Sequence, residues 1–255
     1  MTHWCLSQKD GIYMVKQKPK IIYENTVPGN FVRRINRFTA EVLIDGKPEM
    51  VHVKNTGRLQ ELLVPDAKVT LQKTLNPNRK TAYDLISVYK SELKWVNIDS
   101  LAPNALMKQQ LISMNYDLVK PEYTYGDSRI DFYMERNGEK FLTEVKGCTL
   151  ADDLHPGTGL FPDAPTERGV KHLHELAKAA KEGYHCAIAF VIQMNGIYRV
   201  LPNEEKQPEF KEALVNAAKA GVQVTFYRCE VETDSIKIAG VSGDTSSLRK
   251  DFCIQ

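Results

Sequence analysis

Residues 129–148 read RIDFYMERNGEKFLTEVKGC and carry the strongest constraint on the fold of this chain. The Asn137-Gly138 dipeptide favours a two-residue β-hairpin turn, because both turn positions require a positive φ. With these two residues as the turn, the pairing register places Asp131 directly opposite Glu144. The stretch is therefore expected to form a hairpin in which two carboxylates face each other.

The alternation of side chains along a strand puts Asp131 and Glu144 on one face, with Arg129 and Lys146 beside them. Two opposed carboxylates repel each other, so something must compensate their charge. A divalent cation such as Mg²⁺ would do so, and so would an ion-pair cluster with the two neighbouring basic residues. The opposite face would belong to the core, since it is nearly all apolar: Ile130, Phe132, Met134, Phe141, Thr143 and Val145.

Length and composition limit the classes of protein to which the chain can belong. The 255 residues are enough for one large or two modest domains, and 42% hydrophobic and 26% charged residues are ordinary for a soluble globular protein. No apolar run of 18 residues is present, so no membrane span or membrane partner is expected. Residues 1–20 lack the apolar core of a signal peptide. Five cysteines without a CxxC pair indicate a reduced, cytoplasmic protein.

Charge is distributed unevenly along the chain. Residues 1–100 carry 16 Lys/Arg against 10 Asp/Glu, a net charge of +6, whereas residues 101–255 carry 18 against 22, a net charge of −4. A basic N-terminal part suggests a polyanionic partner, although an ordinary solvated surface explains the same charge almost as well. The basic residues form three clusters: Arg33, Arg34 and Arg37; Lys54 and Arg58; Arg79 and Lys80.

The N-terminal part reads as a small β-barrel. After an N-terminal extension, residues 1–27 with one candidate strand at 11–15, come strand candidates at 31–44, 49–54, 67–74 and 82–89. Asp45-Gly46 is a hairpin turn between the first two candidates. Several short strands without a helical stretch are typical of a small barrel, either an oligonucleotide-binding fold with basic loops or a purely structural one.

The C-terminal part reads as an α/β domain. A helix is expected at 102–112, and another begins at the Asp163-Ala-Pro-Thr-Glu segment and ends near Glu182. A strand at 185–194, a helix at 204–220 and a strand at 222–229 follow. Helices that alternate with strands after the central hairpin indicate a sheet covered by helices.

The spacing of Asp131, Glu144 and Lys146 is that of the PD-(D/E)XK nucleases, with Ile130 in place of the usual proline. Over roughly residues 28–240 the chain resembles the sugar fermentation stimulation protein A family. Four segments carry this resemblance: Asn55-Thr56-Gly57-Arg58, residues 128–132 (SRIDF), residues 144–150 (EVKGCTL) and residues 161–173 (FPDAPTERGVKHL).

The resemblance implies an α/β protein with two domains. Residues 28–98 would form an N-terminal OB-fold-like β-barrel that binds nucleic acid, and residues 99–240 a C-terminal PD-(D/E)XK nuclease-like α/β domain, followed by a polar tail at 241–255. It also implies binding to DNA, or alternatively RNA, without sequence preference. A role in regulating sugar (maltose) metabolism is suggested for members of the family.

The resemblance further implies a Mg²⁺ site, with Mn²⁺ as an alternative ion, in which Asp131, Glu144 and the Val145 carbonyl are ligands. Lys146 would hold or activate the attacking water, as metal-assisted phosphodiester cleavage requires. Arg168, Lys171 and His172 would contact the phosphate.

The chain departs from the family at one position of the expected first helix. Family members usually carry a Glu where this chain has Gln109. Its amide brings no charge to a metal, which puts a second metal ion and vigorous catalysis in doubt. Three functions stay open: a Mg²⁺-dependent nuclease, a DNA-binding regulator without turnover, and a metabolic or structural protein with no nucleic-acid partner.

Overall fold

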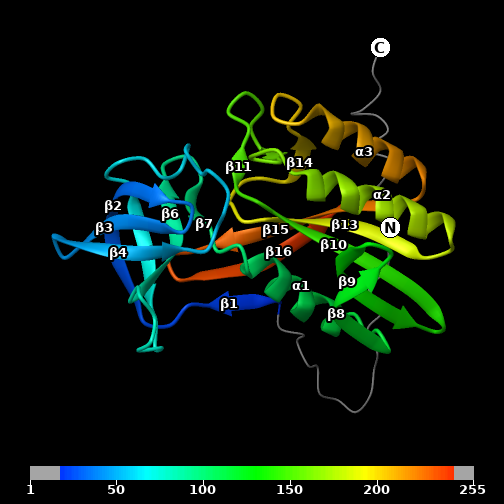
Figure 1. The fold of residues 1–255 in the computed structure, drawn as a ribbon, viewed down its shortest axis with the longest axis horizontal. Helices are drawn as coiled ribbons and strands as arrows, with labels where there is room; N and C mark the ends of the chain where they lie inside the picture. Colours follow the sequence, from blue (N-terminus) through cyan, green and yellow to red (C-terminus); the bar gives the residue numbers. More distant parts are fainter. Residues whose placement is uncertain (1–17, 244–255) are drawn as a thin grey trace.

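The computed structural model describes residues 18–243 as a β-barrel followed by a larger sheet covered by helices (Figure 1). The strand expected at 11–15 and the part of the expected polar tail after residue 243 lie outside the described residues. Within residues 18–243, no helix has both the length and the apolar character needed to cross a bilayer.

The N-terminal unit is an OB-fold barrel. Apolar residues alternate with polar ones along its strands, so that Ala40, Val42 and Ile44 point into the barrel while their neighbours face outward. The strand order is β4-β3-β2-β5-β6-β7, and an additional parallel pairing of β4 with β6 closes the barrel. Its strands are β2 (Thr26–Asn36), β3 (Thr39–Ile44), β4 (Lys47–Val53), β5 (Lys68–Lys73), β6 (Tyr83–Lys90) and β7 (Lys94–Asn97).

The strand expected at 31–44 is wrong as a single element. The chain turns at Arg37 and Phe38, and β2 and β3 pair antiparallel across this turn. Neither residue is a turn former, so the local sequence gives no signal for the reversal. The Asp45-Gly46 hairpin turn is confirmed, and both residues have positive φ values.

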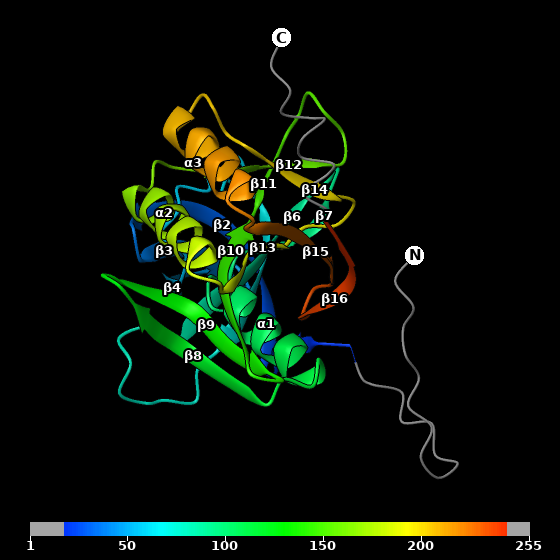
Figure 2. The same cartoon turned by 90° about the vertical axis from the view of Figure 1, so that its right-hand side faces the viewer.

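The C-terminal unit is a seven-stranded mixed sheet in the order β1-β16-β15-β13-β10-β9-β8. β10, β13 and β15 run parallel, as expected for strands joined by helical crossovers. Helix α1 (Ala102–Ser113) packs on one face, and α2 (Glu167–Lys181) and α3 (Pro208–Lys219) pack on the other (Figure 2). The strands are β1 (Lys20–Ile22), β8 (Leu118–Tyr125), β9 (Ser128–Arg136), β10 (Glu139–Cys148), β13 (His185–Ile192), β15 (Gln223–Val231) and β16 (Ser235–Ser242). This unit and the barrel bear out the predicted fold class, an OB-fold joined to a PD-(D/E)XK-like α/β domain.

The predicted register of the β9–β10 hairpin is confirmed. Asn137 and Gly138 both adopt positive φ, and the paired positions run from Glu139 opposite Arg136 to Thr143 opposite Phe132. The ladder ends there, one position before Asp131 and Glu144. The hairpin therefore delivers the two carboxylates to the point where β10 leaves β9.

The prediction that only one face of this hairpin joins the core is wrong. Phe132, Met134 and Val145 do pack in the cluster that includes α1, as expected. Tyr133 and Leu142, on the face shared with the carboxylates, are also buried, in the cluster that includes α2. Both faces of the sheet are covered, so the charged pair lies at the edge of a packed layer and not on an open surface.

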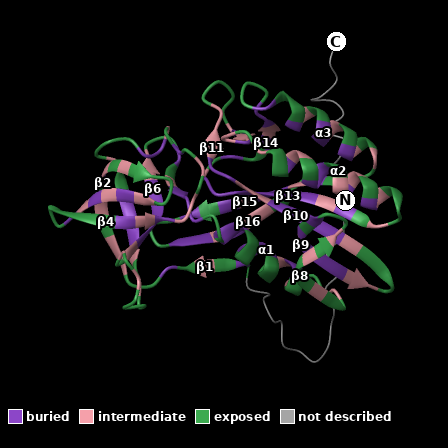
Figure 3. Cartoon of the chain, viewed as in Figure 1, coloured by how far each residue is buried: buried purple, intermediate pink, exposed green. Residues whose placement is uncertain are grey.

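A small second sheet completes the surroundings of the site. β11 (Leu150–Ala151) pairs with β12 (Thr158–Phe161), which pairs in parallel with β14 (Arg199–Pro202). Buried residues run without a break from the interior of the barrel to the layer between the large sheet and α2 and α3 (Figure 3). The barrel and the C-terminal unit therefore share one core.

Candidate metal and phosphate site

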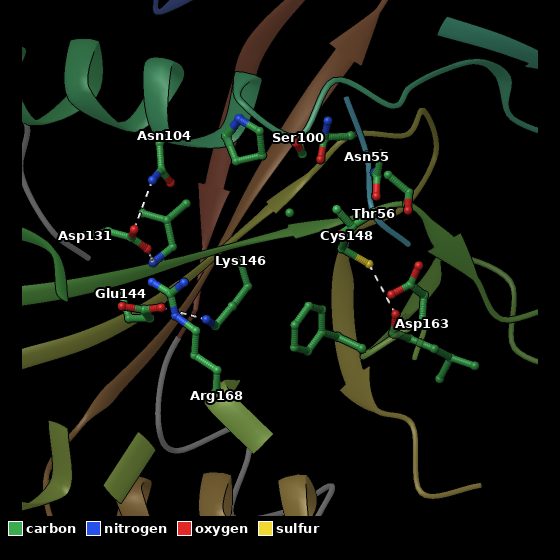
Figure 4. Close-up of a pocket in the computed structure, with 17 residues that line it drawn as sticks. Asn55, Thr56, Ser100, Asn104, Asp131, Glu144, Lys146, Cys148, Asp163 and Arg168 are labelled. Atoms are coloured by element: carbon green, nitrogen blue, oxygen red, sulfur yellow. Dashed lines mark hydrogen bonds and ion pairs between the residues drawn. The ribbon is translucent and has the colours of Figure 1, made fainter. Parts of the chain in front are cut away.

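A cavity of about 410 Å³ lies where the end of β10 meets the barrel (Figure 4). The β9–β10 hairpin contributes Asp131, Glu144 and Lys146 to its wall. The other segments come from distant parts of the sequence, and their lining residues include Asn55 and Thr56 after β4, Ser100 and Asn104 at the start of α1, Asp163 after β12, and Arg168 in α2.

Glu144 is the most buried charged group of the cavity, with 2% of its surface exposed. Its Oε1 atom accepts a hydrogen bond of 2.6 Å from Lys146 Nζ and another from His172 Nδ1. Burial alone would raise the pKa of Glu144, but the His172 hydrogen bond and the Lys146 charge outweigh it and hold the pKa below its usual value. Its Oε2 atom is buried and has no partner among the described residues.

Asp131 is held by two neutral donors. Its Oδ2 atom accepts a hydrogen bond of 2.8 Å from the Val145 N–H, and its Oδ1 atom accepts one of 3.0 Å from the Asn104 side chain. Burial and then the charge of Glu144 raise the pKa of Asp131. The site therefore contains two carboxylates whose repulsion is only partly relieved by protein groups.

Arg129 does not compensate these carboxylates, contrary to the ion-pair alternative for the hairpin. Its side chain is exposed and its Nη2 atom lies 3.7 Å from Glu122 Oε1 on β8. Lys146 does contact Glu144, as that alternative requires.

His172 occupies a different position from the predicted phosphate contact. It is 3% exposed and lies under Glu144. Arg168 Nε donates to His172 Nε2 over 3.3 Å, so in a neutral ring the proton is on Nδ1, which donates to Glu144. Arg168 is exposed and lines the cavity. Lys171 is also exposed but does not line the cavity, and its Nζ atom donates to the Asp127 carbonyl over 2.9 Å.

Several predicted nucleic-acid-binding residues are engaged within the protein. Arg33 pairs with Glu41 at 2.7 Å, and Arg79 makes a two-pronged pair with Asp84. Lys54 lies 3.4 Å from Asp84 and 3.2 Å from Asp99. Within the barrel, the predicted contacts that are exposed and form no ion pair with another described residue are Arg37, Arg58 and Lys80.

Arg34 has a structural role that the sequence did not suggest. All five of its N–H groups donate to backbone carbonyls, so none is left for a phosphate. Nε donates to Asn36 (3.2 Å), Nη1 to Gly57 (2.6 Å) and Arg58 (3.0 Å), and Nη2 to Arg37 (2.6 Å) and Asn55 (2.6 Å).

Gln109 lies on another face of α1 from the residue that reaches the site. Its side chain exchanges two hydrogen bonds with the backbone of Lys20 in β1, at 3.0 and 3.2 Å. Asn104, five positions earlier, points at Asp131. The departure at Gln109 therefore concerns the attachment of β1 to α1 and not the ligands of a metal.

Sequence reasoning missed Asn104 and Asp163 as site residues. Asp163 packs so closely against the loop after β4 that a Cβ on Gly57 would lie 2.2 Å from its Oδ2 atom. Burial raises the pKa of Asp163, against the opposing effect of Arg34 and Arg58. Gly57 and Asp163 both lie in segments that carry the family resemblance. This shared resemblance was the one sequence feature that linked the two segments.

Comparisons with known proteins match both units of the chain to family models. Residues 32–98 match the family model described as the SfsA N-terminal OB domain, and residues 98–235 match the sugar fermentation stimulation protein RE domain. Sugar fermentation stimulation protein homologs of Clostridium beijerinckii and Desulfitobacterium hafniense are 46% and 45% identical. The matches cover 85% and 84% of this chain and 96% and 94% of the relatives.

A solved structure shows the same fold. It is that of Pyrococcus furiosus SfsA in complex with Ca²⁺, which is 26% identical in sequence and superposes with a TM-score of 0.77. The match covers 89% of this chain and 98% of the solved one.

Proposed function

The chain belongs to the sugar fermentation stimulation protein family, and on this premise we propose that it binds DNA without sequence preference and cleaves phosphodiester bonds at a Mg²⁺-dependent centre. The observation that carries the proposal is the buried, unpartnered Glu144 Oε2 atom beside Asp131 in a cavity shared with the barrel. A buried carboxylate oxygen without a partner is costly unless a ligand satisfies it.

The residues of the cavity fit a hard divalent cation. Mg²⁺ is commonly bound by one or two carboxylates, with water and substrate phosphates completing the shell. Within residues 18–243, no cluster of three or more His, Cys, Asp or Glu side chains suits a metal, which argues against a closed zinc site. The Ca²⁺ bound by Pyrococcus furiosus SfsA supports a divalent cation in the family.

In the proposed reaction Asp131 and Glu144 would hold a Mg²⁺ or Mn²⁺ ion, with the Val145 carbonyl as a third ligand. The bound ion would supply an activated water and charge stabilisation at the phosphate. Lys146 lies beside Glu144 and is placed to orient that water. His172 fixes the orientation of Glu144, and Arg168 at the cavity wall binds the phosphate oxygens.

The proposed DNA binding is supported by the barrel. Its exposed arginines and the +6 charge of residues 1–100 suit phosphate contacts, which position a protein on DNA without reading its sequence. The affinity should then fall as the salt concentration rises, because each phosphate contact releases about 0.7–0.9 counterions.

A second candidate is a DNA-binding regulator of sugar (maltose) metabolism genes with weak turnover or none. It is favoured by the small donor set of the cavity, in which Asn104 supplies an amide where a third carboxylate would strengthen metal binding.

Incubation with supercoiled plasmid in Mg²⁺, Mn²⁺ or EDTA tests the proposal. We expect cleavage with either metal, none in EDTA, and none with Asp131→Asn. Asp127→Asn, which removes the same charge from the exposed β8–β9 turn, is the matched control and should cleave like wild type. Binding in a mobility-shift assay without cleavage in any metal supports the regulator, and absence of both rejects the two candidates.

A further inference from the structure

We propose that the β2–β3 turn and the loop after β4 form an entry platform for single-stranded nucleic acid, in which one base stacks on Phe38. The platform consists of Ile35, Arg37, Phe38 and Arg58. The inference rests on the proposed function and narrows its substrate from DNA in general to an unpaired strand.

The platform is rigid because Arg34 ties its two segments together. The carbonyls of Arg37 and Asn55 both accept from Arg34 Nη2, so the β2–β3 turn and the loop after β4 lie within two hydrogen-bond lengths of each other. Phe38 is also anchored through its own carbonyl, which accepts a bond of 2.8 Å from the Val53 N–H. The platform is thus preorganised, which lowers the entropic cost of binding.

The exposed side chains of the platform suit a single strand. Phe38 is 50% exposed and Ile35 45% exposed, although both belong to a barrel with a full apolar core. Arg37 and Arg58, in the two segments that Arg34 ties together, are exposed and form no ion pair with a described residue. Proteins that bind single strands combine aromatic faces for the bases with cationic groups for the backbone, and both are present here.

The platform continues into the cavity. Asn55 and Thr56 line the cavity and belong to the same loop as Arg58. The positive charge of Arg58 also acts to lower the pKa of Asp163, another residue that lines the cavity, so this charge lies near the cavity wall. The end of β4 points from the barrel toward the C-terminal unit (Figure 1). A strand on the platform therefore has a short path to Asp131 and Glu144.

The size of the cavity favours an unpaired strand over a duplex. Its volume of about 410 Å³ falls in the range of small-molecule pockets, about 300–1,000 Å³. The barrel loop and α2 border it from opposite units of the protein. A cavity of this size suits a single nucleotide of an unpaired strand.

Fluorescence anisotropy with a labelled oligo-dT strand and a blunt duplex of equal length tests the platform. Measurements in EDTA make the result independent of cleavage. We expect wild type to bind the single strand more tightly than the duplex. Phe38→Ala should weaken single-strand binding about five-fold or more, the effect of losing one stacked base. Duplex binding should change less than two-fold.

Two further variants separate stacking from general apolar contact. Phe38→Leu keeps an apolar side chain without a ring and should bind as weakly as Phe38→Ala, whereas Phe38→Trp should bind like wild type. Leu75→Ala is the matched control, because Leu75 is 85% exposed in the β5–β6 loop, beyond the opposite end of β2. It should leave binding unchanged.

The outcomes distinguish the platform from the proposed function. Binding of neither nucleic acid by wild type rejects both. Equal binding of strand and duplex, or single-strand binding that is insensitive to Phe38→Ala, overturns the platform while non-specific DNA binding stands. Weak binding by Phe38→Ala that Phe38→Leu restores also overturns it, because apolar contact and not stacking would then be responsible.

Discussion

At the residue scale, Arg34 shows how an arginine in a basic cluster can be part of the framework and not of the binding surface. Its guanidinium group satisfies five backbone carbonyls from two segments, a geometry that a lysine with three donors cannot reproduce. The exposed neighbours Arg37 and Arg58 are held in place by these bonds.

Arg34→Lys should therefore destabilise the protein although the charge is kept. At least two carbonyls lose their donor, which should lower the free energy of unfolding by about 2–3 kcal/mol. Urea unfolding measures this loss. Arg33→Lys, at an exposed pair with Glu41, should change it by about 0.5 kcal/mol or less. Equal effects of the two substitutions would contradict the role assigned to Arg34.

The carboxylate pair allows a second prediction at this scale. Asp131→Asn removes one charge and the repulsion together, so the metal-free protein should be as stable as wild type or more stable. Wild type should melt at a higher temperature with Mg²⁺ or Mn²⁺, because a ligand that binds the native state stabilises it. Asp131→Asn should lose this shift, and scanning calorimetry detects it.

Lys146→Met should behave differently from Asp131→Asn. It leaves Glu144 with one fewer compensating partner, so the metal-free protein should be less stable. Metal binding should persist while cleavage stops. If wild type shows no metal-dependent shift and Asp131→Asn is strongly destabilised, the pair is a structural ion cluster and the metal centre is rejected.

At the scale of elements, the closure of the barrel depends on a short contact. β4 and β6 pair over His52 with Asp84 and Val53 with Leu85. Asp84 also receives hydrogen bonds from His52 Nδ1 (3.0 Å) and from both Nη atoms of Arg79. Burial alone would raise the pKa of Asp84, but Arg79, His52 and Lys54 outweigh it and hold the pKa below its usual value.

The acid sensitivity of the barrel follows from this shift. Because Asp84 has a lower pKa in the folded protein than in the unfolded chain, its stabilising effect is present above the unfolded value of about 3.9 and is lost as the pH falls through the folded value. At pH 7, Asp84→Asn should cost about 3 kcal/mol, since it leaves Arg79 unpaired. Below pH 4 the difference between variant and wild type should shrink. Unfolding free energies from pH 3 to 7 measure both effects.

Asp45→Asn is the matched control for Asp84→Asn, because asparagine suits the positive φ at that exposed turn. It should leave the stability and its pH dependence nearly unchanged. A constant difference between Asp84→Asn and wild type across the pH range would show that ion pairing does not hold β4 against β6.

What the sequence predicted well at this scale was local. The β9–β10 register follows from a two-residue turn and strict alternation, and it is confirmed up to the Thr143–Phe132 pair, one position before Asp131 and Glu144. The β2–β3 reversal was missed because Arg37 and Phe38 are not turn formers. The position of His172 was missed for another reason: α2 packs on the sheet next to α3, and His172 lies on the side of α2 that faces β10, where it contacts Glu144.

The site residues that come from distant segments could not be predicted from local sequence patterns. Asn104, Asp163 and Asn55 reach the cavity only because the barrel, α1 and β12 meet there. No periodicity or spacing encodes that meeting, and the family resemblance alone brought two of these segments into view.

At the scale of the whole molecule, one buried side chain connects the barrel to the sheet. Gln193, 1% exposed, donates from Nε2 to Asn97 Oδ1 (2.8 Å) and to the carbonyls of Asn97 (3.1 Å) and Asp99 (3.0 Å). These acceptors lie at the end of β7 and on the short segment that leads from it to α1. Gly147 permits the contact, since a Cβ there would lie 2.5 Å from Gln193 Oε1.

This connection also governs the site, because the segment it fixes leads directly to Asn104 and hence to Asp131. Wild type, with its continuous core, should unfold in one calorimetric transition. Gln193→Met keeps the volume but removes the donor to Asn97 Oδ1 and to the Asn97 carbonyl, whereas the Asp99 carbonyl still accepts from the Ala102 N–H. The substitution should cost about 2 kcal/mol or more. We expect the barrel and the C-terminal unit then to melt separately.

The same variant should weaken the metal-dependent rise in melting temperature, because Asn104 would no longer be held against Asp131. Gln60→Met, at an exposed glutamine in the loop after β4, is the control and should retain both the single transition and the full metal effect. If Gln193→Met melts in one transition with an undiminished metal effect, the two units are coupled by their shared apolar core alone, and the segment between β7 and α1 does not position the site.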